Sequence, residues 1–297
     1  MSRPQGFHER LPEPLVRSVV AAAIAEDLGL AGDITTDTIV PPEAMAVGVL
    51  ATRSPGVIAG LQLTEAAFRQ LDPQASFEIL IADGAQAPAN AVVARVSGKA
   101  RALLTAERVA LNFLGRLSGI ATLTRQYVDA IAGCRAHIID TRKTTPGLRA
   151  FEKYAVRAGG GMNHRVGLFD AVLIKDNHIV VAGGIGAAIE AARARAGHMV
   201  KIEVEVDTLA QLPEALTHRV DAVLLDNMSP AELKEAVRLV AGRAITEASG
   251  GVNLDTVRAI AEAGVDLISV GALTHSAPVL DLGLDLEGTA PGQFARP

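Results

Sequence analysis

Apolar positions near the start of the chain recur at helical spacing. They run from Val16 to Ile24, and Gly29 then offers a residue without a Cβ that can end a helix in the left-handed conformation. Three short runs rich in Val and Ile follow, separated by turn residues: 47–51, 77–81 and 92–96. A helix-like stretch at 63–71 lies between the first two runs. This mixture predicts an α+β fold for the first part of the chain.

A long amphipathic stretch comes next. It starts at Thr105-Ala106-Glu107, a sequence that can cap a helix, and continues through Ile131 until Gly133 stops it. Beyond Gly133, six apolar runs alternate with helical patterns: 136–139, 171–174, 202–206, 222–225, 244–246 and 267–270. Parallel strands that helices cover on both faces have this continuous apolar character. The second part of the chain is therefore predicted to be a parallel sheet of strand-and-helix units.

Six such units favour a β/α barrel over an open, doubly wound sheet, because no Gly-x-Gly-x-x-Gly turn follows the first strand. A complete barrel of this type has eight strands. Either a strand is hidden within residues 105–133 or the barrel is incomplete, and the periodicity leaves both readings open.

The composition of the chain excludes several classes of protein. The 297 residues carry a net charge of −5, only 3% are aromatic and none is Trp, which argues against a nucleic-acid-binding protein. No apolar run reaches the roughly 18 residues that span a bilayer. The one cysteine, Cys134, cannot form an internal disulfide, and no basic and then apolar leader opens the chain. We expect a cytoplasmic enzyme that binds neither nucleic acid nor membrane.

Polar residues gather where the predicted strands end. In such a barrel these ends and their loops converge on one mouth, where active sites lie. All six strands contribute: Asp140-Thr141-Arg142-Lys143-Thr144, Lys175-Asp176-Asn177-His178, Glu203 and Glu205 with Asp207, Asp226-Asn227, Glu247-Ala248-Ser249-Gly250-Gly251, and Gly271. Singly, an Asp at such a position can cap a helix and a Gly can serve a turn. Their coincidence at six strand ends favours a binding site.

Positive charge is concentrated in one segment. Residues 135–178 carry eight Lys or Arg and only four acids, in a chain that is negative overall. This excess predicts an anionic small-molecule ligand. Four charged residues have the spacing of a solvated helix face, and we set them aside: Arg149, Glu152, Lys153 and Arg157. The candidate ligand-binding cations that remain are Arg142, Lys143, Arg165 and Lys175.

A glycine loop precedes the second barrel strand. Gly159-Gly160-Gly161 is followed by Met162-Asn163-His164-Arg165. A lone His is more often structural than functional, but the neighbouring Arg165 and the three glycines favour a ligand-binding role. We expect this loop to deliver His164 and Arg165 to the mouth of the barrel.

The last two strands predict a phosphate site. Ser249-Gly250-Gly251 and Gly271 follow them, and glycines at this position let backbone N–H groups approach phosphate oxygens. Glu205 and Asp226 end adjacent strands without a basic neighbour in sequence, which suits a hard cation such as Mg²⁺. No spacing of His and Cys indicates zinc, and we interpret Cys134 as a small apolar filler.

Seven ordered motifs resemble one known family. They are Asp140-Thr-Arg-Lys-Thr-Thr-Pro-Gly147, Gly159-Gly-Gly-Met-Asn-His-Arg165, Leu173-Ile-Lys-Asp-Asn-His178, Glu203-Val-Glu-Val-Asp207, Leu224-Leu-Asp-Asn227, Glu247-Ala-Ser-Gly-Gly-Val252 and Val270-Gly-Ala-Leu-Thr-His-Ser276. Together they closely resemble quinolinate phosphoribosyltransferase, also called carboxylating nicotinate-nucleotide diphosphorylase. The likeness runs from about Glu26 to about Leu286. Ala248 is a mild departure, because many relatives are expected to have a second Ser there.

The resemblance implies both architecture and reaction. We expect an α/β protein with an N-terminal α/β sandwich domain at 1–115, completed by 276–297, and an incomplete, seven-stranded β/α barrel at 116–275. The implied enzyme is a pentosyltransferase of de novo NAD biosynthesis. It converts quinolinate and phosphoribosyl pyrophosphate, with Mg²⁺, to nicotinate mononucleotide, pyrophosphate and CO₂. The implied assembly is a homodimer whose active site is shared between subunits, and larger assemblies are left open.

The resemblance also assigns roles to single residues. The quinolinate-binding groups it implies are Arg108 from the neighbouring subunit, Thr141, Arg142, His164, Arg165 and Lys175. Those it implies for the phosphoribosyl donor are Lys143, Glu205, Asp226, Ser249, Gly250 and Gly271, with Glu205 and Asp226 also serving the metal, directly or through water. The implied catalytic residues are Lys143, Lys175, Glu205 and Asp226.

Three alternatives remain. A paralogue that acts on another acidic heterocycle, such as the type encoded with molybdate transport, would keep the phosphoribosyl motifs. A non-catalytic, ligand-binding homologue would be expected to lose Lys143, Glu205 or Asp226, and all three are present. Nicotinate phosphoribosyltransferase is the third, but a single carboxylate does not require so many cations.

Overall fold

The computed structural model describes residue 7 and residues 9–287; residues 1–6, 8 and 288–297 lie outside the description. The chain divides into two compact units. The first contains the chain up to Leu123, together with Arg157–Gly159 and the residues from Ala277 onward, and the second contains Thr124–Val156 and Gly160–Ser276. The part of the expected C-terminal completion that falls on 288–297 lies outside the described residues.

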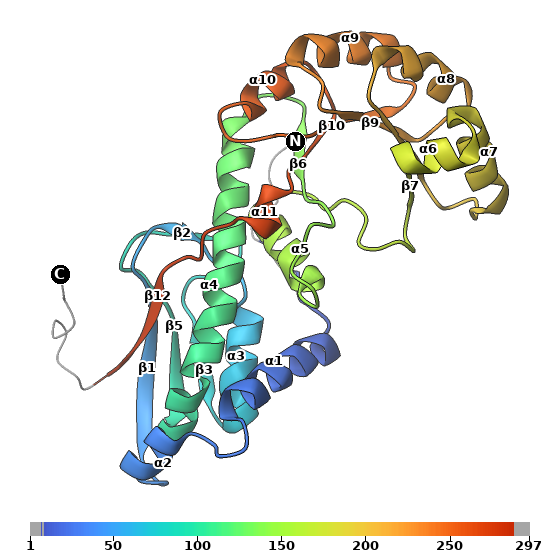
Figure 1. The fold of residues 1–297 in the computed structure, drawn as a ribbon. Coiled ribbons are helices and arrows are strands. Elements are labelled where there is room, and N and C mark those ends of the chain that lie inside the picture. The colour runs from blue at the N-terminus through green and yellow to red at the C-terminus, as the bar shows by residue number, and fades with distance from the viewer. Residues whose placement is uncertain (1–6, 8, 288–297) are drawn as a thin grey trace. The chain divides into compact units, whose positions relative to one another are not determined.

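A four-stranded antiparallel sheet forms the centre of the first unit, in the order β12-β1-β5-β3 (Figure 1). Its strands are β1 (Met45–Thr52), β3 (Ser76–Ile79), β5 (Val92–Lys99) and β12 (Leu282–Leu286). The predicted runs at 47–51, 77–81 and 92–96 are confirmed as β1, β3 and β5. β12 comes from the far end of the sequence and pairs with β1, so this unit contains both ends of the described chain.

Helices and a small second sheet complete the first unit. The helices are α1 (Glu13–Leu28), α2 (Ile34–Ile39) and α3 (Leu61–Leu71), and the small sheet pairs β2 (Gly56–Val57) with β4 (Gln86–Ala87). Gly29 follows α1 with φ 52°, as expected for a glycine at a helix end. α1 packs on α3, and Phe68 and Leu63 of α3 are fully buried. Both predicted helices of this region are confirmed.

The long helix α4 (Ala100–Ala130) starts earlier than the sequence indicated. The Ala100 N–H donates to Ala44 O at 2.8 Å, so the chain passes directly from β5 into the helix. Thr105 does not cap α4; it lies inside the helix, and its hydroxyl donates to Asp33 Oδ2 at 2.9 Å. Because residues 105–130 are helical, this stretch hides no strand. Within the described residues, no helix is long and apolar enough to cross a membrane.

Six parallel strands form the sheet of the second unit, in the order β6-β11-β10-β9-β8-β7. They are β6 (His137–Ile139), β7 (Val172–Ile174), β8 (Ile202–Val206), β9 (Ala222–Asp226), β10 (Ile245–Ser249) and β11 (Leu267–Ser269), which confirms all six predicted runs. A parallel bridge between Ile139 and Met162 adds a one-residue seventh position beside β6. Within the described residues β7 pairs with β8 only, so the barrel is open at that edge. The fold is therefore an incomplete β/α barrel.

Helices follow the strands of the second unit, and Figure 1 shows several of them side by side along the outside of the parallel strands. They are α5 (Arg149–Ala158), α6 (Asp176–Ala182), α7 (Ile185–Arg195), α8 (Leu212–Thr217), α9 (Pro230–Val240), α10 (Val257–Glu262) and α11 (Ala272–His275), with a short 3₁₀ turn, η1 (Leu209–Gln211). The amphipathic α9 is typical, because Ser229 caps it and Leu233, Ala236 and Val240 are its buried face.

The interpretation of the charged residues of α5 as a solvated face is wrong for two of them. Glu152 is fully buried and Lys153 is only 2% exposed. Glu152 accepts a hydrogen bond from the Thr145 N–H, and Lys153 pairs with Asp140. Helical spacing identified a common face, but it could not show that polar loops cover that face. These two side chains hold the loops that carry the candidate site.

Candidate active site

The carboxyl ends of the parallel strands surround a cavity of about 820 Å³. Eleven of the residues expected in the site line it: Thr141, Arg142, Lys143, His164, Arg165, Lys175, Glu205, Asp226, Ser249, Gly250 and Gly271. They come from strand ends and loops that are far apart in sequence. The cavity thus lies where the barrel geometry predicts an active site.

Two arginines are the main cationic groups of the cavity. The Nε atoms of Arg142 and Arg165 are buried, and within the described residues neither has a hydrogen-bond partner. Arg165 Nη1 donates to Ala171 O at 3.0 Å, which fixes one edge of its guanidinium. Burial lowers the pKa of Arg165, and the nearby positive charge of Arg142 lowers it further. Buried N–H donors without partners beside a like charge favour binding of an anion.

A buried ion pair holds the glycine loop in place. The Asp140 carboxylate accepts from Lys153 Nζ, from Asn163 Nδ2 at 2.6 Å and from the His164 N–H at 2.9 Å. Lys153 Nζ also donates to His164 O at 3.0 Å. Burial raises the pKa of Asp140 and lowers that of Lys153, while each residue's charge acts against the shift of the other. This network fixes the backbone on both sides of His164.

The loop after β6 is tied to α11. The Lys143 N–H donates to Thr141 Oγ1 at 3.0 Å, and the Thr274 hydroxyl donates to Lys143 O at 2.7 Å. A Cβ on Gly271 would lie 3.1 Å from Lys143 Cδ, so this glycine leaves room for the lysine stem. Lys143 therefore lies beside the Gly271 end of the cavity.

The acidic side of the cavity lies on the neighbouring strands β8 and β9. Glu205 Oε2 is 2.6 Å from Lys175 Nζ, and Asp226 Oδ2 accepts from Asn227 Nδ2 at 2.6 Å. Glu205 is only 11% exposed at its side chain, whereas Lys175 is 48% exposed. Two carboxylates at adjacent strand ends supply the hard oxygen ligands that Mg²⁺ prefers, so the donor set fits that ion.

Glycine is required at one position of the loop after β10. Gly250 has φ 91°, and a Cβ there would lie 2.1 Å from Asn227 Oδ1. The Asn227 N–H donates to Ser249 O at 2.9 Å, which joins the ends of β9 and β10. Gly251 also has a positive φ, 59°. Such a bare backbone turn can present N–H groups to a phosphate.

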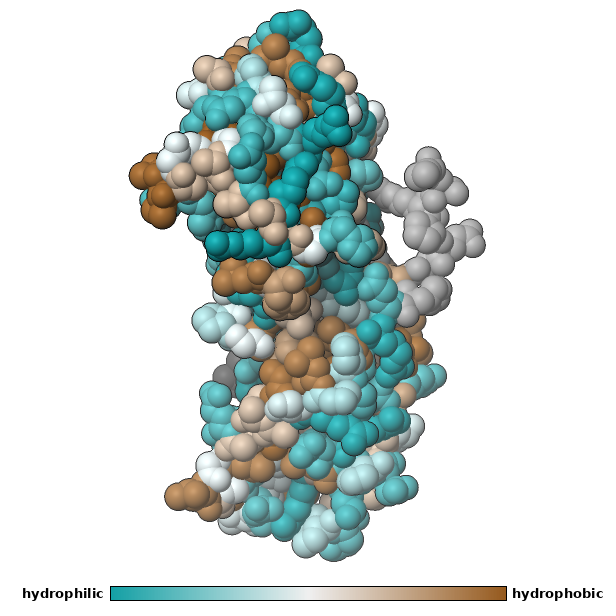
Figure 2. Space-filling view, turned by 90° about the vertical axis from the view of Figure 1, so that its right-hand side faces the viewer, coloured by the Kyte–Doolittle hydropathy of each residue, from teal (hydrophilic) through white to brown (hydrophobic). Residues whose placement is uncertain are grey.

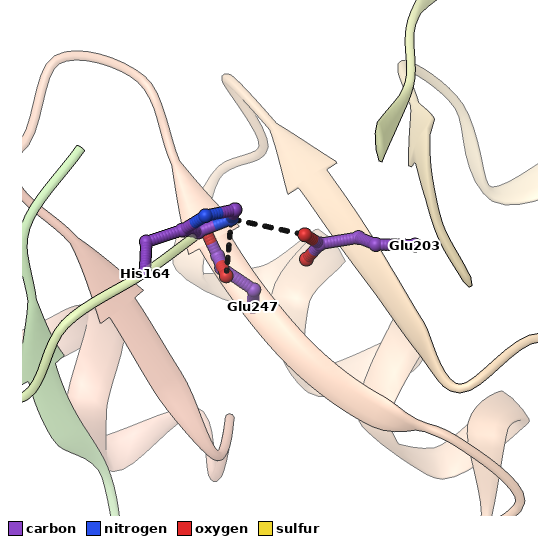
Figure 3. A group of neighbouring side chains, drawn as sticks. All are labelled: His164, Glu203 and Glu247. Atoms are coloured by element: carbon purple, nitrogen blue, oxygen red, sulfur yellow. Dashed lines mark hydrogen bonds and ion pairs between the residues drawn. The ribbon is translucent and has the colours of Figure 1, made fainter. Parts of the chain in front are cut away.

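A second acidic pair lies next to His164, and Figure 3 shows the three side chains converging. His164 Nε2 is 3.0 Å from Glu203 Oε2 and 3.6 Å from Glu247 Oε2. Burial raises the pKa of Glu247 well above its usual range, and the neighbouring Glu203 raises it further. The three residues could hold a metal ion by distance alone. His164 Nδ1 accepts the Arg165 N–H at 2.7 Å, so Nε2 is the ring nitrogen that faces the two carboxyl groups.

One residue expected in the site lies outside the second unit, which contains the cavity. Arg108 is on α4 in the first unit, where it is exposed and has no ion pair or hydrogen bond within the described part of the chain. The cavity is also lined by Glu247, Asn227 and His275, which stand in the quoted strand-end segments and motifs but had no role assigned to them. Alternation along β10 could have indicated Glu247, because Glu247 and Ser249 are two residues apart and share a face of the strand.

Two family models match the chain. Residues 33–118 match the quinolinate phosphoribosyl transferase N-terminal domain, and residues 120–285 match the C-terminal domain. Together these matches cover most of the sequence.

Named proteins from several bacteria resemble the chain over most of its length. The chain is 44% identical over 261 residues to a probable carboxylating nicotinate-nucleotide pyrophosphorylase of Bacillus subtilis, covering 88% of this chain and 90% of the relative. It is 44% identical over 275 residues to the corresponding protein of Mycobacterium leprae, covering 91% and 96%. The crystal structure of NadC from Streptococcus pyogenes superposes with a TM-score of 0.90 at 41% identity, covering 94% and 99%. The chain belongs to the quinolinate phosphoribosyltransferase family.

Proposed function

We propose that this protein transfers the phosphoribosyl group of phosphoribosyl pyrophosphate to the ring nitrogen of quinolinate. The products are nicotinate mononucleotide, pyrophosphate and CO₂, and the pathway is de novo NAD biosynthesis. Membership of the family and the intact set of cavity residues support this assignment.

The observation that carries the proposal is the pair of unpartnered guanidinium donors at Arg142 and Arg165. Quinolinate has two carboxylates on adjacent ring carbons, and each can accept a charge-assisted hydrogen bond from one arginine. Lys175 and Thr141 also line the cavity and can bind the same substrate. Nicotinate has one carboxylate and would leave one of the buried donors without a partner, which is costly.

The other half of the cavity suits the phosphoribosyl donor. Ser249, Gly250 and Gly271 would bind its 5-phosphate through hydroxyl and backbone N–H groups, and Lys143 would bind the pyrophosphate. Glu205 and Asp226 would hold Mg²⁺, which supplies positive charge for the departing pyrophosphate. The same carboxylates can stabilise the positive charge that develops on the ribose ring.

The chain's own residues act mainly by orientation and charge placement. Arg142 and Arg165 fix the plane of the pyridine ring, so that its nitrogen faces the ribose carbon that loses pyrophosphate. After that bond forms, the ring nitrogen is cationic and stabilises the electron pair that stays on the adjacent ring carbon when its carboxylate leaves as CO₂. A proton from water then takes the place of the carboxylate on that carbon. Decarboxylation is therefore driven by the substrate itself, and within the proposed mechanism no covalent enzyme intermediate is needed.

We also propose a homodimer that shares its active sites. Arg108 is an exposed cation that makes no hydrogen bond or ion pair in the described part of its own chain, as expected for a residue that serves a neighbouring subunit. Figure 2 shows hydrophobic groups exposed among hydrophilic ones on the face it displays. The largest exposed hydrophobic side chains of the second unit include Phe169 and Val181, at 82% and 89%. Contact with a second copy would bury such groups.

With its single cysteine, Cys134, the protein suits the reducing cytoplasm.

The proposal is tested by incubating the purified protein with quinolinate, phosphoribosyl pyrophosphate and Mg²⁺ and following nicotinate mononucleotide by chromatography. We expect product from quinolinate and little or none when nicotinate replaces it. In Arg142→Lys, charge is kept but the planar fork is lost, so the KM for quinolinate should rise by roughly tenfold or more while that for the donor changes little. Absence of product, or a preference for nicotinate, would overturn the assignment.

A further inference from the structure

We propose that Glu203 and Glu247 are positioning residues of the dicarboxylate site, and that they act through His164 on Arg165. This inference rests on the proposed function, because it assigns the second acidic pair a task in binding quinolinate. Neither glutamate contacts the groups assigned above to the donor or to Mg²⁺ in any hydrogen bond or ion pair of the described residues.

Both nitrogens of the His164 ring already have partners. The Arg165 backbone N–H donates to Nδ1 at 2.7 Å, so Nδ1 has no proton of its own. The proton of the neutral ring is therefore on Nε2, and it points to Glu203 Oε2 at 3.0 Å. Glu247 Oε2 lies on another side of Nε2, at 3.6 Å (Figure 3). These two hydrogen bonds hold the His164 ring in one orientation, with Nδ1 toward the Arg165 backbone and Nε2 toward Glu203.

The backbone of His164 is held as firmly as its ring. Its N–H donates to Asp140, and its carbonyl accepts from Lys153, two side chains that are themselves buried. With the backbone fixed, the remaining freedom of the residue is rotation of the ring. The hydrogen bond to Glu203 removes that rotation.

Fixing the ring fixes Arg165. The ring nitrogen Nδ1 binds the N–H of the next residue, so the orientation of the ring sets the direction in which the Arg165 backbone leaves the loop. The guanidinium of Arg165 has a buried, unpartnered Nε and is anchored at Ala171 O. A ring that turned away from Glu203 would release this backbone bond and misdirect the guanidinium. The chain of hydrogen bonds therefore runs from Glu203 through His164 to a substrate-binding group, and Glu247 lies beside the same ring nitrogen at 3.6 Å.

The burial of the glutamates supports a task of this kind. Glu203 is 8% exposed and Glu247 only 1%, and each has a buried Oε1 without a partner in the described residues. Two buried carboxyl groups that each keep an unpartnered oxygen are costly, because these oxygens lose their hydration. A role in orienting His164 gives a physical reason why Glu203 and Glu247 are present at this position.

The first test observes the tautomer directly, in the wild-type protein with ¹⁵N-labelled histidine. Long-range ¹H–¹⁵N spectra distinguish the two neutral tautomers from the doubly protonated ring, and the spectrum of His164→Ala identifies the signals of this residue. We expect a neutral ring protonated at Nε2 near pH 7. A ring protonated at Nδ1, or at both nitrogens, would overturn the proposal.

The second test is a double-mutant cycle on quinolinate binding, measured by calorimetry. We expect Glu203→Ala and His164→Ala each to weaken binding about tenfold, and the double variant to bind no more weakly than His164→Ala alone. Glu203→Gln, whose amide oxygen can still accept from Nε2, should lose less than Glu203→Ala. The matched control is Glu235→Ala on α9, a half-buried glutamate that pairs with Arg238 of the same helix, for which we expect no change. Additive losses in the double variant would overturn the proposal.

The two tests separate this inference from the proposed function. Affinity for phosphoribosyl pyrophosphate should stay within about twofold in Glu203→Ala, whereas a merely structural defect would weaken both ligands. If the wild-type protein does not bind quinolinate, the proposed function fails, and the tautomer of His164 still reports on the geometry. If it binds quinolinate but the tautomer differs, only the positioning role fails.

Discussion

The carboxylate of Asp140 and the ammonium of Lys153 form an ion pair in which the two side chains are 0% and 2% exposed. Asp140 directly follows β6, and Lys153 lies on α5 in the region interpreted from sequence as solvated. The pair also binds Asn163 and both backbone groups of His164, so a single buried contact anchors the loop of the candidate active site.

Removing the lysine should be strongly destabilising. In Lys153→Met the Asp140 charge stays buried without its partner, and we expect the free energy of unfolding to fall by about 3–5 kcal/mol. Urea unfolding followed by circular dichroism measures this change. The matched control, Lys234→Met, alters an exposed lysine of α9 and should stay within about 0.5 kcal/mol of the wild type. Equal effects of the two substitutions would show that the buried pair does not stabilise the fold.

Asp72, in the first unit, should make a pH-dependent contribution to the free energy of unfolding. Its carboxylate accepts the Lys99 N–H at 2.9 Å and the Gln74 N–H at 3.1 Å, and the bond from Lys99 is the main cause of its lowered pKa. Because the pKa of Asp72 is lower in the folded state, its carboxylate stabilises the folded protein at pH values above the unfolded-state pKa of about 3.9. This stabilisation is lost as the pH falls through the folded-state pKa.

Asp72→Asn removes this titration. We expect the variant to be less stable than the wild type by about 1–3 kcal/mol at pH 7, with a difference that shrinks as the pH falls below about 4. Urea midpoints at several pH values provide the measurement. A difference that stays constant, or that widens in acid, would contradict the role assigned to the carboxylate.

A side chain at position 250 should affect the donor site and leave the other substrate's site intact. In Gly250→Val the added side chain collides with Asn227, and the valine must adopt the positive φ of the glycine that it replaces. We therefore expect the KM for phosphoribosyl pyrophosphate to rise by at least about tenfold. Quinolinate affinity should change little. Gly197→Ala is the control, because a Cβ there meets nothing within 4 Å. Normal donor affinity in Gly250→Val would remove this loop from the phosphate site.

The shared active site can be tested by mixing two inactive variants, Arg108→Ala and Lys175→Ala, and allowing subunits to exchange. If Arg108 serves the partner's cavity, each mixed dimer has one complete site, and random pairing restores about a quarter of wild-type activity. If Arg108 serves its own chain, every site lacks one group. No recovery in a mixture that contains mixed dimers by native mass spectrometry would contradict sharing.

Much of the fold followed from local signals. The six barrel strands were predictable because each is a continuous apolar run, as parallel strands buried on both faces are. The two-residue strands β2 and β4 were not, since two residues show no period. The start of α4 was misplaced because Thr105 looks like a cap in sequence, whereas its hydroxyl binds Asp33, a residue far away along the chain.

The candidate site was predictable where chemistry coincides with strand ends, as for Arg142 and Asp226. Lys153 was misinterpreted because helical spacing does not tell whether water or a polar loop covers a face. Glu203 was passed over in favour of Glu205, although both alternate onto the same face of β8. Only the structure shows that Glu205 meets Lys175 while Glu203 meets His164.

We expect this protein to join quinolinate to the phosphoribosyl group and to remove one carboxylate in the same reaction. The most direct measurement uses quinolinate labelled with ¹³C in the carboxylate next to the ring nitrogen, with phosphoribosyl pyrophosphate and Mg²⁺, and follows CO₂ and nicotinate mononucleotide together. We predict labelled CO₂ and unlabelled mononucleotide in equal amounts, and none of either when the donor is omitted. Retention of the label in the product, or CO₂ released without mononucleotide, would contradict the account.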